Sequence, residues 1–155
     1  MKMTFKTEGF IEMDKALDAF APATGKNILR RAGMAALQPM AATMRANAPR
    51  QAGGDNDLAD SIDVGTKLNK RQKKLNRGVD VVEIYVGPSG QGGENAPPQG
   101  TQQEFGNENH GPQPFARPAL DQHIGGLLEG LAVEMRPEID KATGRAQRKA
   151  LKARR

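Results

Sequence analysis

The chain has 155 residues with a net charge of +5, and 37% of them are hydrophobic but only 4% aromatic. This length suits one domain whose core depends on alanine and methionine. The chain has no cysteine and two histidines, which excludes a disulfide framework, a thiolate nucleophile and a thiolate metal site. No stretch is apolar enough to span a membrane, and acidic residues near the start stand where a signal peptide needs an apolar run, so we expect a soluble protein made in a reducing cytoplasm.

Two helices are predicted first. Residues 8–20 form an amphipathic pattern in which four apolar side chains recur at helical intervals, namely Phe10, Met13, Leu17 and Phe20. Thr24 is then placed to cap a second helix over about 25–47, which is rich in alanine and methionine. Its small side chains allow close approach of another element. Pro39 is expected to kink this helix or mark its end.

Two strands follow a loop at 48–57. The first is predicted within residues 58–68, where Ile62, Val64 and Thr66 alternate, and the second over 79–87, which is rich in valine. The segment 67–78 between them contains six basic residues, Lys67, Lys70, Arg71, Lys73, Lys74 and Arg77. We therefore predict an antiparallel hairpin with a long basic arm.

A glycine-rich loop at 88–111 is expected to be mobile, with one helical turn near residues 101–106. Apolar spacing from Ala116 to about Met135 predicts a long helix that Gly125 and Gly126 weaken. Pro137 is expected to end or kink it. The fold class is therefore α+β, with a single domain over 1–137 and a basic C-terminal tail at 138–155.

Residues suited to catalysis or to metal binding are few, and we predict no catalytic residue, metal or cofactor. His110 lies in a polar loop and His123 on a helix, and both are interpreted as surface side chains. Asp55 and Asp57 resemble part of a calcium loop, but the glycine and the distal glutamate of that motif are missing. An enzyme is the least supported class.

The arm 67–78 and the C-terminal tail are candidate docking sites for a polyanion or a protein partner. The tail contributes Arg145, Arg148, Lys149, Lys152, Arg154 and Arg155. Charge runs are usually solvated surfaces, but they can also neutralise nucleic-acid phosphates. Neither segment has an aromatic residue to stack on bases, so any binding of nucleic acid should be independent of sequence.

Prolines stiffen the entry to the long helix. Pro112, Pro114 and Pro118 each fix a backbone angle, and Pro118 suits the first turn of a helix, where its missing N–H costs nothing. Arg117 and Asp121 are four residues apart and could pair. The segment therefore anchors the preceding loop to the helix at a defined angle.

Three motifs resemble a known family. They are Ala48-Pro49, a glycine-containing loop and Leu58-Ala59-Asp60-Ser61-Ile62; then Val86-Gly87 closing a strand; then Glu104-Phe105-Gly106 followed by Pro114-Phe115-Ala116-Arg117-Pro118-Ala119-Leu120. Together they resemble the tail-completion or head–tail joining proteins of bacteriophages with long non-contractile tails, over roughly residues 10–135. Departures are the loop at 88–100, the longer loop before Leu58, and Ala116, where a larger apolar residue is common.

The resemblance implies a small α+β structural subunit without enzymatic activity. Such subunits assemble as a ring, expected here to be a hexamer, at the neck of the virion. Their partners are copies of themselves, the connector, and tail-tube or tail-terminator proteins, with only passing contact with DNA and no membrane or small-molecule substrate. The interface residues expected on this basis are Glu104, Phe105, Gly106, Pro114, Phe115, Arg117 and Pro118. Plain core packing of Phe105 and Phe115 is an equally good interpretation.

Two functions therefore follow from the sequence. The first is a virion subunit that completes the tail and joins it to the DNA-filled head. The alternative is a sequence-independent nucleic-acid-binding protein that uses the basic arm and tail. The salt dependence of DNA retention separates the two, because only a true binder shows a steep slope.

Overall fold

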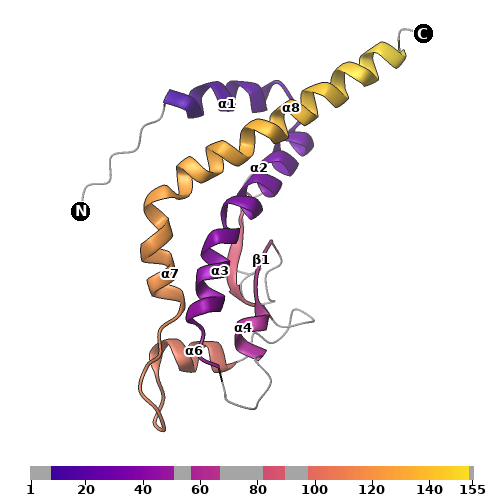
Figure 1. Ribbon diagram of the computed structural model, residues 1–155. Helices are drawn as coiled ribbons and strands as arrows, with labels where there is room; N and C mark the ends of the chain where they lie inside the picture. Colours follow the sequence, from indigo (N-terminus) through magenta and orange to yellow (C-terminus); the bar gives the residue numbers. More distant parts are fainter. Residues whose placement is uncertain (1–7, 51–56, 67–81, 90–97, 154–155) are drawn as a thin grey trace. The chain divides into compact units, whose positions relative to one another are not determined.

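A computed structural model describes residues 8–50, 57–66, 82–89 and 98–153 (Figure 1). The helices are α1 (Glu8–Asp18), α2 (Pro22–Ala36), α3 (Gln38–Asn47), α4 (Asp57–Ser61), α6 (Pro98–Phe105), α7 (Ala116–His123) and α8 (Leu127–Ala153). The strands are β1 (Ile62–Gly65) and β2 (Tyr85–Pro88), and a 3₁₀ turn, η1 (Ile124–Gly126), links α7 to α8. The predicted α+β class, with N-terminal helices, a small antiparallel sheet and a long C-terminal helix, is confirmed.

The chain divides into two compact units, which are described separately. Unit 1 comprises residues 1–36 and 128–155, and its described helices are α1, α2 and α8. Its core joins one residue from each of the three helices, Met13, Ala32 and Met135, with Leu17, Leu29, Leu131 and Ile139 packed around them. The helical spacing predicted for α1 is therefore the spacing that turns Met13 and Leu17 to the core.

Unit 2 comprises residues 37–127 and is built around α3. One part of α3 packs against the sheet, where Ile62 and Val64 of β1 are buried. α3 also packs against α7, and Ala41 of α3 and Ala119 of α7 are both fully buried, with exposed fractions of 0%. Arg45 of α3 fixes the sheet further, because its Nε donates a hydrogen bond to the carbonyl of Ile62 at 2.8 Å.

The sheet has two antiparallel strands with Val64 of β1 opposite Val86 of β2. The strands are shorter than the segments predicted to contain them. β1 occupies 62–65 of the segment 58–68, because residues 57–61 form α4, and residues 82–84 lie outside β2. The basic arm at 67–78 lies outside the described residues.

The helices are interrupted near proline and glycine residues of the sequence. The single helix predicted over about 25–47 is interrupted beside Pro39, because α2 ends at Ala36 and Pro39 lies in the first turn of α3. The predicted cap was wrong, because α2 begins at Pro22 and Thr24 already lies inside it. The glycines at 125 and 126 fall in η1, which interrupts the long C-terminal helix where weakening was expected.

Of the two outcomes predicted at Pro137, an end or a kink of the C-terminal helix, the end does not occur. Proline inside a helix removes one backbone hydrogen bond, yet α8 continues through Pro137 to Ala153. Met135 before it and Ala142 after it are both buried in unit 1, so packing on either side offsets the lost bond. The segment 138–153, expected to form a basic tail, is helical.

Candidate functional site

Glu104, in the last turn of α6, organises the segment that carries the third motif. Its side chain is buried, with 6% of the residue exposed. Oε2 accepts hydrogen bonds from the backbone N–H groups of Phe115 and Ala116, both at 2.9 Å, and Oε1 accepts one from the N–H of Arg117 at 3.1 Å. A single carboxylate thus joins the end of α6 to the start of α7.

These three donors are groups that a helix cannot satisfy by itself. The first four N–H groups of a helix lack partners within it, and Phe115, at the N-cap of α7, provides no side-chain cap. Glu104 accepts hydrogen bonds from the N–H groups of the N-cap residue and of the next two residues. The fourth residue is Pro118, which has no backbone N–H group. None of the first four positions of α7 therefore leaves a backbone N–H group without an acceptor.

The same carboxylate forms an ion pair with the side chain of Arg117, whose Nε lies 3.2 Å from Oε1. Burial by itself raises the pKa of Glu104. The backbone hydrogen bonds from Ala116, Phe115 and Arg117, together with the charge of Arg117, outweigh that effect and place the pKa below the ordinary value of 4.5. Glu104 is therefore ionised at neutral pH. The predicted pair of Arg117 with Asp121 was wrong, because among the described residues Arg117 pairs with Glu104.

The two phenylalanines of the motif have different roles. Phe115 is 2% exposed and belongs to the core of unit 2, whereas Phe105 is 65% exposed. The guanidinium carbon of Arg117 lies 4.5 Å from the centre of the Phe105 ring, which is a cation–π contact. Arg117 is thus held between a buried carboxylate and an exposed ring, and its side chain keeps 58% of its surface accessible. We call the exposed side chains Phe105 and Arg117 the Phe–Arg pair.

Gly106 makes the turn that follows α6. Its φ is +80°, a conformation that side chains disfavour, and a Cβ there would lie 3.0 Å from the backbone N of Pro112. The returning chain is fixed at Gln113, whose N–H donates to the carbonyl of Gln103 at 2.7 Å. Within the loop, the side chain of Asn107 accepts the N–H of His110 at 3.0 Å.

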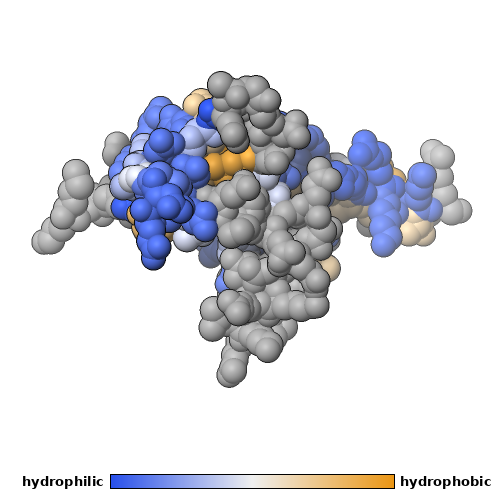
Figure 2. Space-filling view, turned by 90° about the horizontal axis from the view of Figure 1, so that it is seen from below, coloured by the Kyte–Doolittle hydropathy of each residue, from blue (hydrophilic) through white to orange (hydrophobic). Residues whose placement is uncertain are grey.

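Exposure therefore separates the predicted interface residues. Glu104 and Phe115 are buried within unit 2, and Gly106 is half-buried in the turn. Pro114 and Pro118 are exposed, as is the Phe–Arg pair. In Figure 2, where α6 and the loop after it face the viewer, most of the described surface is hydrophilic.

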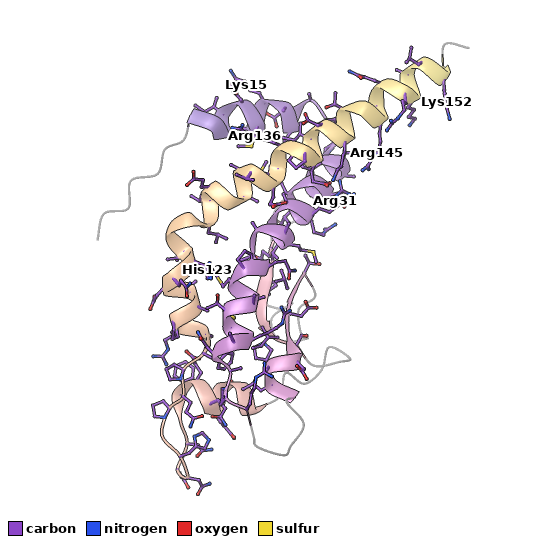
Figure 3. The ribbon with its side chains drawn as sticks, in the orientation of Figure 1. Lys15, Arg31, His123, Arg136, Arg145 and Lys152 are labelled. Carbon is purple, nitrogen blue, oxygen red and sulfur yellow. The ribbon has the colours of Figure 1, made fainter. Side chains whose placement is uncertain are left out.

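His123 of α7 has a structural role that the sequence did not reveal. Its Nε2 lies 2.8 Å from the hydroxyl of Thr43 in α3, and that hydroxyl donates its one hydrogen to the carbonyl of Pro39. The tautomer of His123 determines which of the two groups donates in this hydrogen bond. Figure 3 shows His123 on α7 beside α3. His110 instead lies in the loop after α6, with its Nδ1 3.0 Å from the carbonyl of Gly111.

Nothing in the described part of the chain groups three or more histidine, cysteine or carboxylate side chains as a metal site. None of its helices is long and apolar enough to cross a membrane. Of the basic residues predicted to dock a partner, Arg145, Arg148, Lys149 and Lys152 lie exposed on α8. The arm 67–78, Arg154 and Arg155 lie outside the described residues.

The cap formed by Glu104 is the feature that sequence reasoning missed. One signal was available: α7 begins after Phe115, a position where serine, threonine, aspartate or asparagine would normally supply the cap. Their absence leaves the first N–H groups of the helix to be accepted by another element or by water. Glu104 is a carboxylate in the preceding helix and within the same motif.

The comparisons with known proteins agree with the resemblance seen in the sequence. Residues 11–90 match the model of a family described as "Bacteriophage HK97-gp10, putative tail-component". The match covers more than half of the chain, and the chain belongs to this family. The protein is thus a structural component of a phage tail and part of the virion.

The matched range ends before Glu104, so the Phe–Arg pair and the cap of α7 lie outside it. Neither the curated proteins nor the solved structures contain a match to this chain.

Proposed function

We propose that this tail component forms a ring at the phage neck, completes the tail and joins it to the DNA-filled head, without enzymatic activity. The observation that carries the proposal is the Phe–Arg pair, which is exposed and held by a buried carboxylate in a chain of a tail-component family. Arginine and aromatic side chains dominate the binding energy of many protein interfaces.

The fixed geometry of the Phe–Arg pair favours its use in an interface. Ordering a long side chain costs free energy on association, and a side chain that is already ordered avoids much of that cost. Arg117 is ordered by Glu104 on one side and by Phe105 on the other. The pair is therefore prepared to contact a neighbouring copy or another protein of the neck.

The test is a phage in which this gene carries a stop codon. In a nonpermissive host we expect filled heads and tails that remain separate in electron micrographs, and complementation by a plasmid copy should restore whole virions. Whole infectious virions in the absence of the protein would refute the neck role.

The contribution of the Phe–Arg pair is tested by complementation with Phe105→Ala. Because Phe105 is mostly exposed, this variant should keep its free energy of unfolding within about 1 kcal/mol and yet lower the yield of joined particles. Gln102→Ala, at another exposed position of α6, is the matched control. Equal yields from the two variants would remove the pair from the interface.

A second candidate function is sequence-independent binding of nucleic acid. It is favoured by Arg145, Arg148, Lys149 and Lys152, which are exposed on α8 and have no ion-pair partner in the described part of the chain. Retention on DNA that falls steeply as salt rises would support it. Weak retention at physiological salt would leave the neck role as the better account.

A further inference from the structure

The last turns of α8 are uncovered. Ala142 is the last buried residue of the helix, and from 143 to 153 every residue is exposed except Gly144, which is half-buried. Within unit 1, this part of α8 extends beyond α1 and α2 (Figure 1). A helical segment of this length gains little stability by itself in water. It therefore benefits from a partner that packs along it.

One face of this segment is basic. Arg145, Arg148 and Lys152 are spaced by three and four residues, which places them on the same side of the helix. None has an ion-pair partner among the described residues, whereas Lys141 pairs with Glu138 at 2.9 Å. Figure 3 shows Arg145 and Lys152 on this end of α8. Beside them, Leu151 is 65% exposed.

A complementary face lies on α1. Ile11, Asp14 and Asp18 follow the same spacing of three and four residues and are all exposed, Ile11 at 57%. In the described part of the chain neither aspartate has an ion-pair partner. Lys15 adds one positive charge to this face and Glu12 adds a negative charge beside it. The opposite side of α1 packs in the core through Met13.

We propose that the uncovered end of α8 in one copy packs on the exposed face of α1 in the next copy. Arg148 and Lys152 are four residues apart, as are Asp14 and Asp18. Each pair thus spans about 6 Å along its helix axis, so that both ion pairs can form in one register. Ile11 and Leu151 add apolar surface beside the charges.

We expect this contact between copies. Within one copy, α8 is one continuous helix from Leu127 to Ala153, and among the described residues no ion pair joins its last turns to α1. The two faces differ, and each copy carries both. A contact of this kind repeats from copy to copy and closes into a ring when the rotation allows. The inference therefore rests on the proposed ring and names the surfaces that join its neighbours.

A second copy fits these faces better than nucleic acid does. A phosphate group makes no favourable apolar contact with an exposed leucine. Residues 141–155 also contain no aromatic side chain that could stack on a base. A second copy supplies both the missing carboxylates and an exposed apolar side chain. The same chain thus carries the complement of its own basic face.

Charge reversal in the full-length protein tests the contact. We make two charge-reversed variants, Asp14→Lys with Asp18→Lys and Arg148→Glu with Lys152→Glu. Each should lower the association constant for self-association, measured by light scattering, at least tenfold. Combining all four substitutions should restore it, because the charges are then exchanged. Glu108→Lys with Asp121→Lys makes the same charge change at exposed positions of unit 2 and is the control. Failure of the combination to restore assembly would overturn the inference.

Cross-linking locates the contact directly, because the chain contains no cysteine. Copies with Asp14→Cys and copies with Arg148→Cys are mixed and treated with a short bismaleimide. We expect a higher yield of cross-linked mixed dimer from this mixture than from a control mixture of copies with Asp14→Cys and copies with Glu108→Cys. Virions purified from cells that express both variants extend the test to assembly that occurs only on the tail. Equal yields from the two mixtures in solution and in virions would overturn the inference.

The outcomes separate this contact from the neck role. If the charge-reversed variants assemble and complement the phage normally, the α1–α8 contact is wrong and the neck role stands. If the phage does not need the protein to join heads and tails, the neck role fails, whereas rescue by the four combined substitutions still supports the contact. If Arg148→Glu with Lys152→Glu abolishes only DNA retention and leaves self-association intact, the basic face binds nucleic acid and the inference is overturned.

Discussion

Replacement of Glu104 by alanine leaves the backbone N–H groups of Phe115, Ala116 and Arg117 without their acceptor. The bond to Phe115 is buried and the other two are partly buried. A buried donor without a partner costs about 2 kcal/mol, and a donor that water can reach costs about 0.5 to 1 kcal/mol. We therefore expect Glu104→Ala to lower the free energy of unfolding of unit 2 by about 3 to 4 kcal/mol.

Glu104→Gln separates the shape of this side chain from its charge. The amide keeps one oxygen for the N–H groups but turns an NH₂ group toward another donor, so we expect a loss of about 1 to 2 kcal/mol. Glu108→Ala, an exposed glutamate in the following loop, is the matched control. Urea unfolding followed by circular dichroism measures all three variants. If Glu104→Ala costs no more than Glu108→Ala, the capping role is refuted.

Lowering the pH should also reduce the contribution of the Glu104 carboxylate to folding stability. The pKa of Glu104 is lower in the folded protein than its ordinary value of 4.5, because the hydrogen bonds and Arg117 outweigh burial. Its contribution to stability is therefore complete above the unfolded-state pKa and is lost as the pH falls through the folded-state pKa. Between pH 6 and pH 3 the wild-type protein should lose more stability than Glu104→Gln. Parallel pH profiles of the two proteins would contradict this assignment.

Three further substitutions test other parts of the structure by urea unfolding. Gly106→Ala should cost about 1 to 2 kcal/mol because of its positive φ and its closeness to the returning chain, whereas Gly111→Ala, with open space around it, should cost less. Thr43→Val should cost about 1 kcal/mol in the wild type but much less in a His123→Ala background, and equal costs would rule out their hydrogen bond. Pro137→Ala should stabilise unit 1 by up to about 3 kcal/mol, and a loss of stability would show that α8 needs the proline.

The sequence predicted helices better than it predicted contacts between them. Periodicity located α1 and two core residues of α8, Leu131 and Met135, although Leu120, Ile124 and Leu128 of the same pattern are exposed. Pro39 and the two glycines at 125 and 126 marked real interruptions. These features depend on residues within a few positions of one another. The helix over 57–61 was missed because five residues are too few for a period to be seen before a β-branched strand.

Contacts between distant residues were harder to predict. Composition could not distinguish Phe105 from Phe115, because both lie in the same motif and only packing buries one of them. Arg117 was matched to a neighbour four residues away, whereas its partner is thirteen residues back along the chain. Pro137 was judged by its local cost, and burial on both sides of it offsets that cost.

The cap made by Glu104 has a consequence for how such a surface can evolve. Three of its bonds reach backbone N–H groups, which every residue except proline possesses. Side chains exposed around the start of α7 can therefore be exchanged without loss of the cap, as long as Glu104 remains. A virus whose neighbouring proteins change can alter the exposed surface and keep the helix entry that supports it. In this short segment the backbone N–H groups stabilise the fold, whereas the exposed side chains determine which partner binds.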